Sequence, residues 1–212
     1  MTTILAIITS VVSAVLVFML QSSYKENRKL KKDKEESRTK HEAAMENIRR
    51  MNRSAARMGL PALPEEDTLQ ALHALIKLEA DWVPHGEGTS MYIRPFMIGD
   101  DEHLGVHGIG RAHFIIILSP SGSYYSGGMA PVKIMIEDED VRAVRGGTGE
   151  AKCGGNYAAS VRAGDRAEEK GYTQVLWLDG VERKYIEEVG AMNIMFKIDG
   201  KIYTAACDGT VL

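Results

Sequence analysis

The most hydrophobic stretch of the chain is Ile4–Leu20, where 17 consecutive residues carry no charge. As a helix, this run would be about 26 Å long at 1.5 Å per residue, which is close to the thickness of a bilayer core. Basic residues are dense from Lys25 to Lys40, and the positive-inside rule then places the N-terminus outside and the rest in the cytoplasm. We expect a transmembrane-type helix over residues 1–22, with a buried or interfacial helix as the alternative.

Residues 23–46 are almost entirely polar and mix both signs of charge. Lysine and glutamate favour helices, and opposite charges recur at i, i+4 spacing. The pattern predicts a charged, solvated helical stalk that continues from the anchor. Its basic cluster could also contact anionic lipid.

Amphipathic patterns in the next part of the chain predict one helix and two strands. Hydrophobic residues at helical spacing place the helix at Glu65–Leu78. Alternation over Ser90–Ile98 predicts a strand that carries Tyr92 and Arg94 on one face. The apolar run within His113–Ser119 predicts a second strand, buried on both faces.

Beyond residue 130 the pattern predicts short strands around one helix. The helix covers Asn156–Lys170 and ends before Gly171, which suits a C-cap. The acidic run Glu137–Asp140 indicates a solvated turn, and Asp199-Gly200 is a strong two-residue hairpin signal. The expected strands are Val132–Glu137, Gln174–Asp179, Lys184–Glu188 and Met192–Ile198.

Composition narrows the classes of partner. The chain has 212 residues, 44% hydrophobic and 26% charged, with a net charge of −3. This balance suits one or two globular domains and gives no reason to expect a nucleic acid partner. The two cysteines, Cys153 and Cys207, are expected to be free thiols in a reducing compartment. His103 and His107 flank a loop, but no third ligand stands at a spacing typical of metal sites.

The segment richest in candidate chemistry is Gly146–Tyr157, which reads GGTGEAKCGGNY. Two glycine-rich turns flank Lys152, and glycines let a bulky ligand approach the backbone closely. A lysine that loses its hydration in such a place becomes a nucleophile toward carbonyl compounds. The residues alone leave a second interpretation open, in which Lys152 is a solvated lysine in a glycine-rich surface turn.

Longer stretches carry a resemblance to a known family. The chain closely resembles the branched-chain amino acid aminotransferases in four stretches, which read DWVPHGEGTSMYIRPFMIG, ILSPSGSYYSGG, GGTGEAKCGGNYAAS and QVLWLDGVERKYIEEVGAMNIMF. These matches keep the family's order and similar spacing over about residues 47–212. The resemblance implies an α+β fold with two domains, as in the class IV (fold-type IV) aminotransferases, which depend on pyridoxal 5′-phosphate.

The resemblance also implies a domain organisation. Residues 47–120 would form the small domain without its N-terminal strands, residues 121–130 the interdomain loop, and residues 131–212 the first part of the cofactor-binding large domain. By register, Ala43 stands where the family has a phosphate-binding arginine. We therefore expect an incomplete fold and a truncated or fused form with little activity.

Roles for individual residues follow from the same resemblance. Lys152 would be the catalytic residue and would bond covalently to the cofactor, while Tyr157 would donate to its phenolic oxygen. Glu188 would face the pyridine nitrogen, and its neighbour Glu187 would point the other way on a strand. On the substrate side, the matching residues are Tyr92, Arg94 and Tyr124.

The implied reaction transfers the amino group of leucine, isoleucine or valine to 2-oxoglutarate. The complete enzyme would be a homodimer, and the enzyme-like part would be cytoplasmic, anchored to the inner face of the membrane by residues 4–20. Two alternatives remain. One is another class IV enzyme, such as a D-amino acid transaminase or an aminodeoxychorismate lyase. The other is a non-enzymatic, membrane-anchored protein that carries an aminotransferase remnant.

Overall fold

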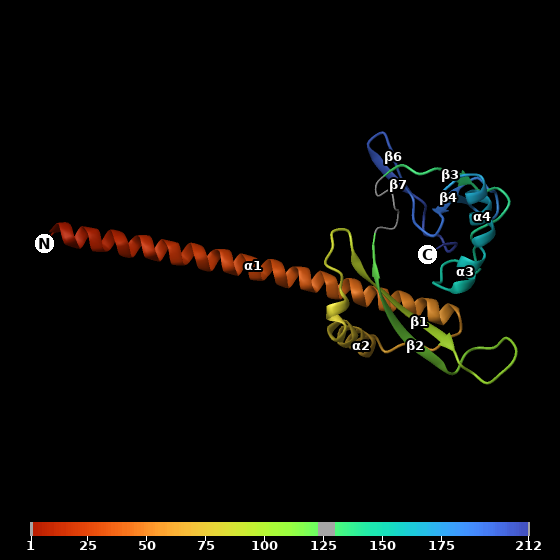
Figure 1. Ribbon diagram of the computed structural model, residues 1–212, viewed down its shortest axis with the longest axis horizontal. Helices are drawn as coiled ribbons and strands as arrows, with labels where there is room; N and C mark the ends of the chain where they lie inside the picture. The colour runs from red at the N-terminus through yellow and green to blue at the C-terminus, as the bar shows by residue number, and fades with distance from the viewer. Residues whose placement is uncertain (1, 123–129, 212) are drawn as a thin grey trace. The chain divides into compact units, whose positions relative to one another are not determined.

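The computed structural model describes residues 2–122 and 130–211, with side chains from residue 25 onward. The chain divides into two compact units, Met1–Asn47 and Ile48–Leu212. Helix α1, Thr2–Arg57, begins in the first unit and ends in the second (Figure 1). The other helices and strands all belong to the second unit.

Within the first unit, α1 is solvated over residues 25–43. Ion pairs one helical turn apart support this stretch, with 2.8 Å between Lys40 Nζ and Glu36 Oε1 and 3.4 Å between Arg38 Nε and Glu42 Oε1. The predicted helical, solvated character of the stalk is therefore confirmed over these residues.

Among the residues whose side chains the structure describes, no helix is long and apolar enough to cross a membrane. The predicted anchor at Ile4–Leu20 lies outside those residues, so it stays a prediction.

The first half of the second unit contains the end of α1, helix α2 at Glu65–Leu78 and a short 3-10 helix at Ala80–Trp82. The predicted bounds of α2 are confirmed. Three acidic residues fill its first turn, where they interact favourably with the helix dipole. Strands β1, Ser90–Gly99, and β2, Ala112–Ser121, follow as an antiparallel pair.

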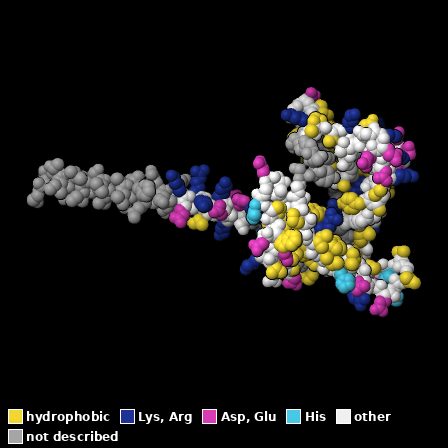
Figure 2. Space-filling model, in the orientation of Figure 1, with side chains coloured by type: hydrophobic (Ala, Val, Ile, Leu, Met, Phe, Trp, Pro, Cys, Tyr) yellow, Lys and Arg dark blue, Asp and Glu magenta, His cyan; other side chains and the backbone are white. Residues whose placement is uncertain are grey.

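The prediction that the β2 strand is buried on both faces is wrong. β2 pairs with β1 in a two-stranded sheet, and no residue of β2 is fully buried. Ile117 remains 49% exposed, and Figure 2 shows hydrophobic side chains at the surface over this hairpin. A two-stranded sheet offers less cover than the apolar run led us to expect, since a run of this kind is typical of strands inside larger sheets.

The second half of the unit is built on a three-stranded sheet in the order β3-β4-β5. Its strands are Ile134–Ile136, Gln174–Leu178 and Ile186–Val189. β3 and β4 are parallel, whereas β4 and β5 are antiparallel. The predicted strands are thus present with shorter or shifted bounds.

Two helices connect β3 to β4 along the chain: α3 at Gly154–Ala158 and α4 at Val161–Glu169. The core forms where α4 lies beside β4 (Figure 1). It consists of Ala163, Ala167, Val175 and Trp177, each at most 2% exposed. Small alanines let the helix approach the sheet closely, and the indole of Trp177 is satisfied by the carbonyl of Gly190 at 2.9 Å.

The single helix predicted at Asn156–Lys170 is interrupted. The amide of Ser160 bonds to the carbonyl of Tyr157 rather than one residue further back, and the Ser160 hydroxyl donates to the same carbonyl at 2.7 Å. Serine side chains compete with helical backbone bonds in this way. The predicted end at Gly171 is confirmed, because its φ is 77° and its amide bonds to the carbonyl of Glu168.

A hairpin completes the described elements, with β6 at Met195–Ile198 and β7 at Lys201–Thr204. Its turn residues, Asp199 and Gly200, have φ values of 49° and 76°. Two consecutive positive φ angles are what a type I′ turn requires. The predicted hairpin is confirmed, although β6 begins three residues later than expected.

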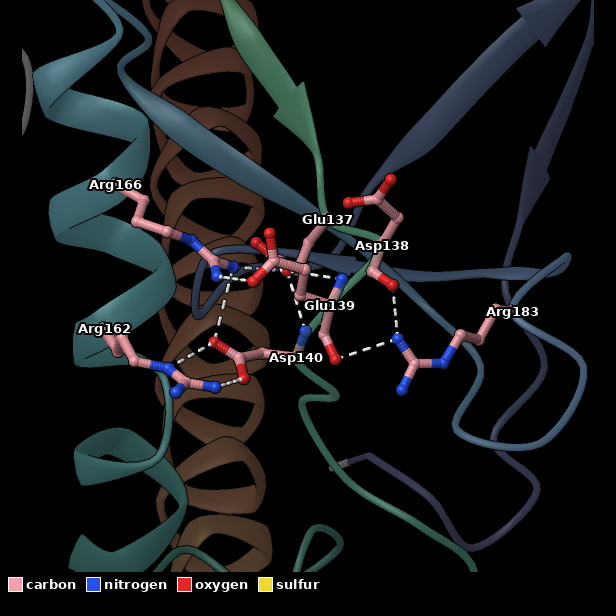
Figure 3. Close-up of polar contacts among 7 residues, drawn as sticks. All are labelled: Glu137, Asp138, Glu139, Asp140, Arg162, Arg166 and Arg183. Atoms are coloured by element: carbon pink, nitrogen blue, oxygen red, sulfur yellow. Dashed lines mark hydrogen bonds and ion pairs between the residues drawn. The ribbon is translucent and has the colours of Figure 1, made fainter.

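The acidic run Glu137–Asp140, predicted as a solvated turn, is solvated only in part, because Asp138 and Glu139 are exposed whereas Glu137 is buried. Glu137 is 2% exposed, and its Oε1 accepts hydrogen bonds from the amides of Glu139 and Asp140, both at 2.8 Å, and from Arg166 at 2.5 Å (Figure 3). Burial disfavours the charged carboxylate, but these three hydrogen bonds outweigh burial and lower the pKa of Glu137.

Other arginines complete the cluster around this run. Arg162 of α4 pairs with Asp140, and Arg183 donates to the carbonyls of Asp138 and Glu139 (Figure 3). A shallow cavity of about 250 Å³ adjoins the cluster, and Glu137, Arg166, Lys170 and Tyr172 contribute to its lining. The cluster ties the loop after β3 to α4 and so fixes where the glycine-rich segment begins.

Candidate active site

The glycine-rich segment that carries Lys152 lies between β3 and α3 and is folded into tight turns. The amides of Gly147 and Ala151 close these turns onto the carbonyls of Val144 and Thr148, each at 2.9 Å. Gly149 is packed so closely that a Cβ there would lie 1.9 Å from the Thr210 carbonyl oxygen. At this position, glycine is therefore required for close packing of the backbone.

Asn156 holds this turn from inside. It is 6% exposed, and its amide nitrogen donates to the carbonyls of Thr148 at 2.8 Å and Ala151 at 2.7 Å. The Thr148 hydroxyl returns a hydrogen bond to the Asn156 side-chain oxygen at 2.9 Å. Sequence reasoning missed this role, although an asparagine directly after two glycines at a helix start is a usable signal.

The C-terminal end of α1 braces the same segment from outside. The backbone amide of Lys152 donates to Ser54 Oγ at 2.9 Å. Arg57 donates from Nη2 to the carbonyls of Gly146 and Gly147, at 2.8 and 2.9 Å. Nearly one hundred residues separate Ser54 from Lys152, so no local pattern could have indicated this contact.

Lys152 itself is oriented by Tyr157. Its Nζ donates to the Tyr157 hydroxyl and lies 5.0 Å from the centre of the tyrosine ring. Lys152 is exposed, which agrees with the interpretation of a solvated lysine and not with the alternative in which it loses its hydration. The amine is positioned by a hydrogen bond and an aromatic face, with its free side open to solvent.

Glu188 supplies a buried carboxylate to the same cluster. Its Oε2 lies 3.5 Å from Arg142 Nε, and both side chains are more than nine-tenths buried. Neither of these two atoms has a hydrogen-bond partner among the described residues. Burial raises the pKa of Glu188, although the charges of Arg142 and Lys152 partly oppose this effect.

Arg142 links the buried carboxylate to the rest of the cluster. Its Nη1 donates to the Asn156 carbonyl at 3.3 Å, and its guanidinium lies 5.6 Å from the centre of the Tyr157 ring. Arg142 is 8% exposed, and sequence reasoning did not identify it. The described contacts thus join four side chains into one cluster: Arg142, Lys152, Tyr157 and Glu188.

Glu187 is also buried, at 8% exposure, but it belongs to a different environment. Burial raises its pKa, and its electrostatic partners include Thr210, Asp208 and Asp179, whereas those of Glu188 are Arg142 and Lys152. Adjacent residues in a strand alternate between faces, which accounts for the two sets of partners.

The residues predicted for the substrate side form a second pair. Arg94 of β1 donates to the Tyr92 hydroxyl at 3.3 Å, and its guanidinium lies 5.2 Å from the tyrosine ring centre. Their predicted shared face is confirmed. Tyr124 lies outside the described residues. No group of three or more His, Cys, Asp or Glu side chains in the described part of the chain could hold a metal ion.

Comparison with known proteins places the lysine-bearing fold in a family. Residues 43–212 match the family model described as "Amino-transferase class IV". The chain belongs to the class IV aminotransferases. The predicted α+β class IV fold is therefore confirmed, in partial form, because the chain spans about half the length of the curated relatives it matches.

Two of those relatives come from the same organism, and both names refer to branched-chain amino acids. The chain is 54% identical over 166 residues to branched-chain-amino-acid aminotransferase 2 of Bacillus subtilis, covering 78% of this chain and 46% of the relative. It is 55% identical over 168 residues to branched-chain-amino-acid transaminase 1 of the same organism, covering 79% and 47%.

Solved structures of other aminotransferases share the fold. An aminotransferase from Brucella abortus, solved with the cofactor PLP bound, matches at a TM-score of 0.62 and 22% identity, covering 80% of this chain and 57% of that one. The branched-chain aminotransferase of Thermoproteus uzoniensis matches at a TM-score of 0.65 and 22% identity, covering 79% and 54%.

Proposed function

We propose that this chain forms part of the active site of a branched-chain amino acid aminotransferase, with Lys152 as the residue that bonds covalently to pyridoxal 5′-phosphate. The observation that carries the proposal is the contact between the Lys152 amine and the Tyr157 hydroxyl, in one cluster with the buried carboxylate of Glu188. The Oε2 atom of this carboxylate has no hydrogen-bond partner among the described residues. The names of the relatives at 54–55% identity support branched-chain amino acids, that is leucine, isoleucine or valine, as amino donors. The proposed acceptor is 2-oxoglutarate, as the family resemblance implies.

The residues present fit this cofactor. An amine that is exposed and held by a hydroxyl can reach an aldehyde, and the unpartnered Glu188 Oε2 can accept a hydrogen bond from a protonated ring nitrogen. When bound, pyridoxal 5′-phosphate supplies an electron-accepting ring to the reaction. Glu188 would keep the ring nitrogen protonated, and Tyr157 would donate to the phenolic oxygen.

Lys152 would have a second task once its amine is free. A neutral amine at this position can take the proton from the Cα of the bound amino acid and return it elsewhere, as a general base and then a general acid. Tyr157 holds the amine at the start of this transfer. Both tasks need the amine at one fixed place, which Asn156, Ser54 and Arg57 secure through the backbone.

Recognition of the substrate carboxylate would fall to Arg94. Its planar guanidinium matches a carboxylate in two-point geometry, and Tyr92 orients it through the hydroxyl and the ring. Tyr124 would close over the substrate from the proposed interdomain loop at residues 121–130, between the proposed domains at 47–120 and 131–212.

A single-turnover assay tests this function. The purified chain is loaded with one equivalent of pyridoxal 5′-phosphate and mixed with L-leucine. The expected products are 4-methyl-2-oxopentanoate and pyridoxamine 5′-phosphate, and Lys152→Ala should abolish both. Lys170→Ala, which changes the residue just after α4, serves as the control and should leave both products.

Two outcomes would contradict the proposal. Product formation that persists in Lys152→Ala would show that Lys152 is not required for the reaction. Conversion of D-alanine in place of L-leucine would assign the chain to another class IV activity.

We also infer that residues 4–20 anchor the protein with the N-terminus outside and the enzyme-like part at the inner face of the membrane, and that the complete enzyme is a homodimer. The uncharged run and the basic residues after it support the anchor. Protease added to sealed inverted vesicles should digest the enzyme-like part. Protection of that part would contradict the orientation, and a monomeric mass by light scattering in detergent would contradict the dimer.

A further inference from the structure

We propose that Arg142 is a positioning residue that holds Glu188 in its charged form, so that this carboxylate can pair with a protonated ring nitrogen. The inference rests on the proposed function for its purpose, but its physical content concerns two side chains of this chain. Arg142 Nε and Glu188 Oε2 lie 3.5 Å apart, at 6% and 7% side-chain exposure.

Burial by itself favours the neutral form of Glu188. A carboxylate removed from water loses its hydration, so burial favours the protonated form, and no hydrogen bond to Oε2 compensates within the described residues. A neutral carboxyl could not stabilise a cation on a ligand through charge. The ionised form must therefore be supported by neighbouring positive charge.

Two cations act on Glu188: Arg142 from the loop after β3 and Lys152 from the glycine-rich segment. The acid next to it in β5, Glu187, is also buried and adds no support. Lys152 cannot serve throughout the proposed reaction, because its amine must be neutral to take up a proton or to bond to an aldehyde. An arginine keeps its charge at all relevant pH values. Arg142 is therefore the constant source of positive charge.

The position of Arg142 suits this task. Its Nη1 is fixed on the Asn156 carbonyl, and the side chain of Asn156 is the one that holds the turn before Lys152. Its guanidinium also faces the Tyr157 ring at 5.6 Å. One side chain thus sets the charge of the carboxylate from within the framework that places the lysine.

The test compares Arg142→Met with Arg145→Met in the cofactor-free chain. Arg145 stands three residues away, is exposed, and pairs with Asp208 at 2.7 Å, which makes it a matched control. Carboxyl ¹³C NMR titration of glutamate-labelled protein, with Glu188→Gln to assign the signal, measures the ionisation of Glu188. Removal of a neighbouring opposite charge should raise the apparent pKa of Glu188 by about one to three pH units in Arg142→Met only.

Once the signal is assigned, the unmodified chain gives a result that does not depend on the Arg142 variants folding. Glu188 should be ionised at pH 7 when Arg142 is present. A protonated Glu188 at pH 7, or a titration unchanged by Arg142→Met, would overturn the inference. Arg142→Lys, which keeps a cation, should give a titration between those of the other two proteins.

A second readout connects the pair to the cofactor. Pyridoxal 5′-phosphate should bind more tightly than an analogue with carbon in place of the ring nitrogen, and Arg142→Met should remove at least about tenfold of this preference. Preference that survives Arg142→Met would contradict the inference. If neither compound reaches Lys152 in the unmodified chain, the proposed function fails, while the NMR titration still decides whether Arg142 keeps Glu188 charged.

Discussion

Two buried glutamates of the second unit lie beside arginines, yet their pKa values shift in opposite directions. Glu137 accepts three hydrogen bonds at one oxygen, and its pKa is lowered. Glu188 lies 3.5 Å from Arg142, without a hydrogen bond at the nearer oxygen, and its pKa is raised. Proximity to an arginine therefore does not decide ionisation, because hydrogen bonds to the carboxylate must also outweigh its lost hydration.

The difference separates a structural site from a chemical one. Around Glu137, the arginines of α4 join two segments of the fold (Figure 3). Each of the two glutamates keeps a buried Oε2 without a hydrogen-bond partner among the described residues, but only Glu188 belongs to the cluster in which the exposed Lys152 contacts Tyr157.

The largest expected effect comes from breaking the arginine–carboxylate cluster around Glu137. Arg166→Met leaves the Glu137 charge buried without its cation, which costs about 3–5 kcal/mol of the free energy of unfolding. Urea denaturation followed by circular dichroism measures the change. Arg162→Met, whose side chain is 73% exposed, should cost much less, because solvent screens its ion pair with Asp140. Equal losses in the two variants would remove the distinction between buried anchor and surface pair.

At Glu188, removal of the charge should change the free energy of unfolding in the opposite direction. Glu188→Gln removes a buried charge that lacks a hydrogen bond, so it should stabilise the cofactor-free chain at pH 7 by on the order of 1 kcal/mol. The same variant should weaken pyridoxal 5′-phosphate binding, measured by absorbance titration. A destabilised apo chain with unchanged cofactor affinity would show that Glu188 is a structural residue like Glu137.

The pH dependence of stability should distinguish the two glutamates again. The folded pKa of Glu137 lies below its unfolded value, so its contribution is present above about pH 4.5 and is lost as pH falls through the folded pKa. The folded pKa of Glu188 lies above its unfolded value, so its burial costs stability at neutral pH, and this cost is relieved as pH falls.

Glu188→Gln should therefore gain stability over the unmodified chain at pH 7 but not at pH 4, as measured by thermal unfolding across this range. Glu137→Gln should lose stability at pH 7 and approach the unmodified chain at low pH. Parallel pH profiles for the two variants would contradict the comparison.

The smallest effect is expected at the rim of the site. Arg145 and Asp208 pair at 2.7 Å, with side chains 71% and 46% exposed. Arg145→Ala should change the free energy of unfolding by at most about 1 kcal/mol and leave cofactor binding unchanged. A larger effect would mean that this pair holds the segment around Gly149 in place.

Local features were predictable from the sequence, whereas long-range ones were not. The spacing of leucines predicts α2, and Asp199-Gly200 predicts the β6–β7 hairpin, since both signals act within a few residues. The burial of Glu137 could not be predicted because it depends on Arg166, 29 residues further on. The neighbourhood of Arg142 and Glu188 likewise depends on tertiary packing.

For the site, the family resemblance identified Lys152, Tyr157 and Glu188, and the structure brings these three together with Arg142. The residues alone left a desolvated and a solvated Lys152 as alternatives, and the structure agrees with the solvated one, because Lys152 is exposed. The hydrogen bonds of Ser54 and Arg57 to the glycine-rich segment could not be predicted, because about ninety residues or more separate them from it in the sequence.

The central claim is that Lys152 is the residue that bonds to the cofactor, and borohydride reduction tests it most directly. Reduction of the chain with one equivalent of pyridoxal 5′-phosphate, followed by peptide mass spectrometry, should find the pyridoxyl group on the peptide that contains Lys152. It should be absent in Lys152→Ala and retained in Lys170→Ala. A label spread over several exposed lysines, or one that persists in Lys152→Ala, would contradict the account.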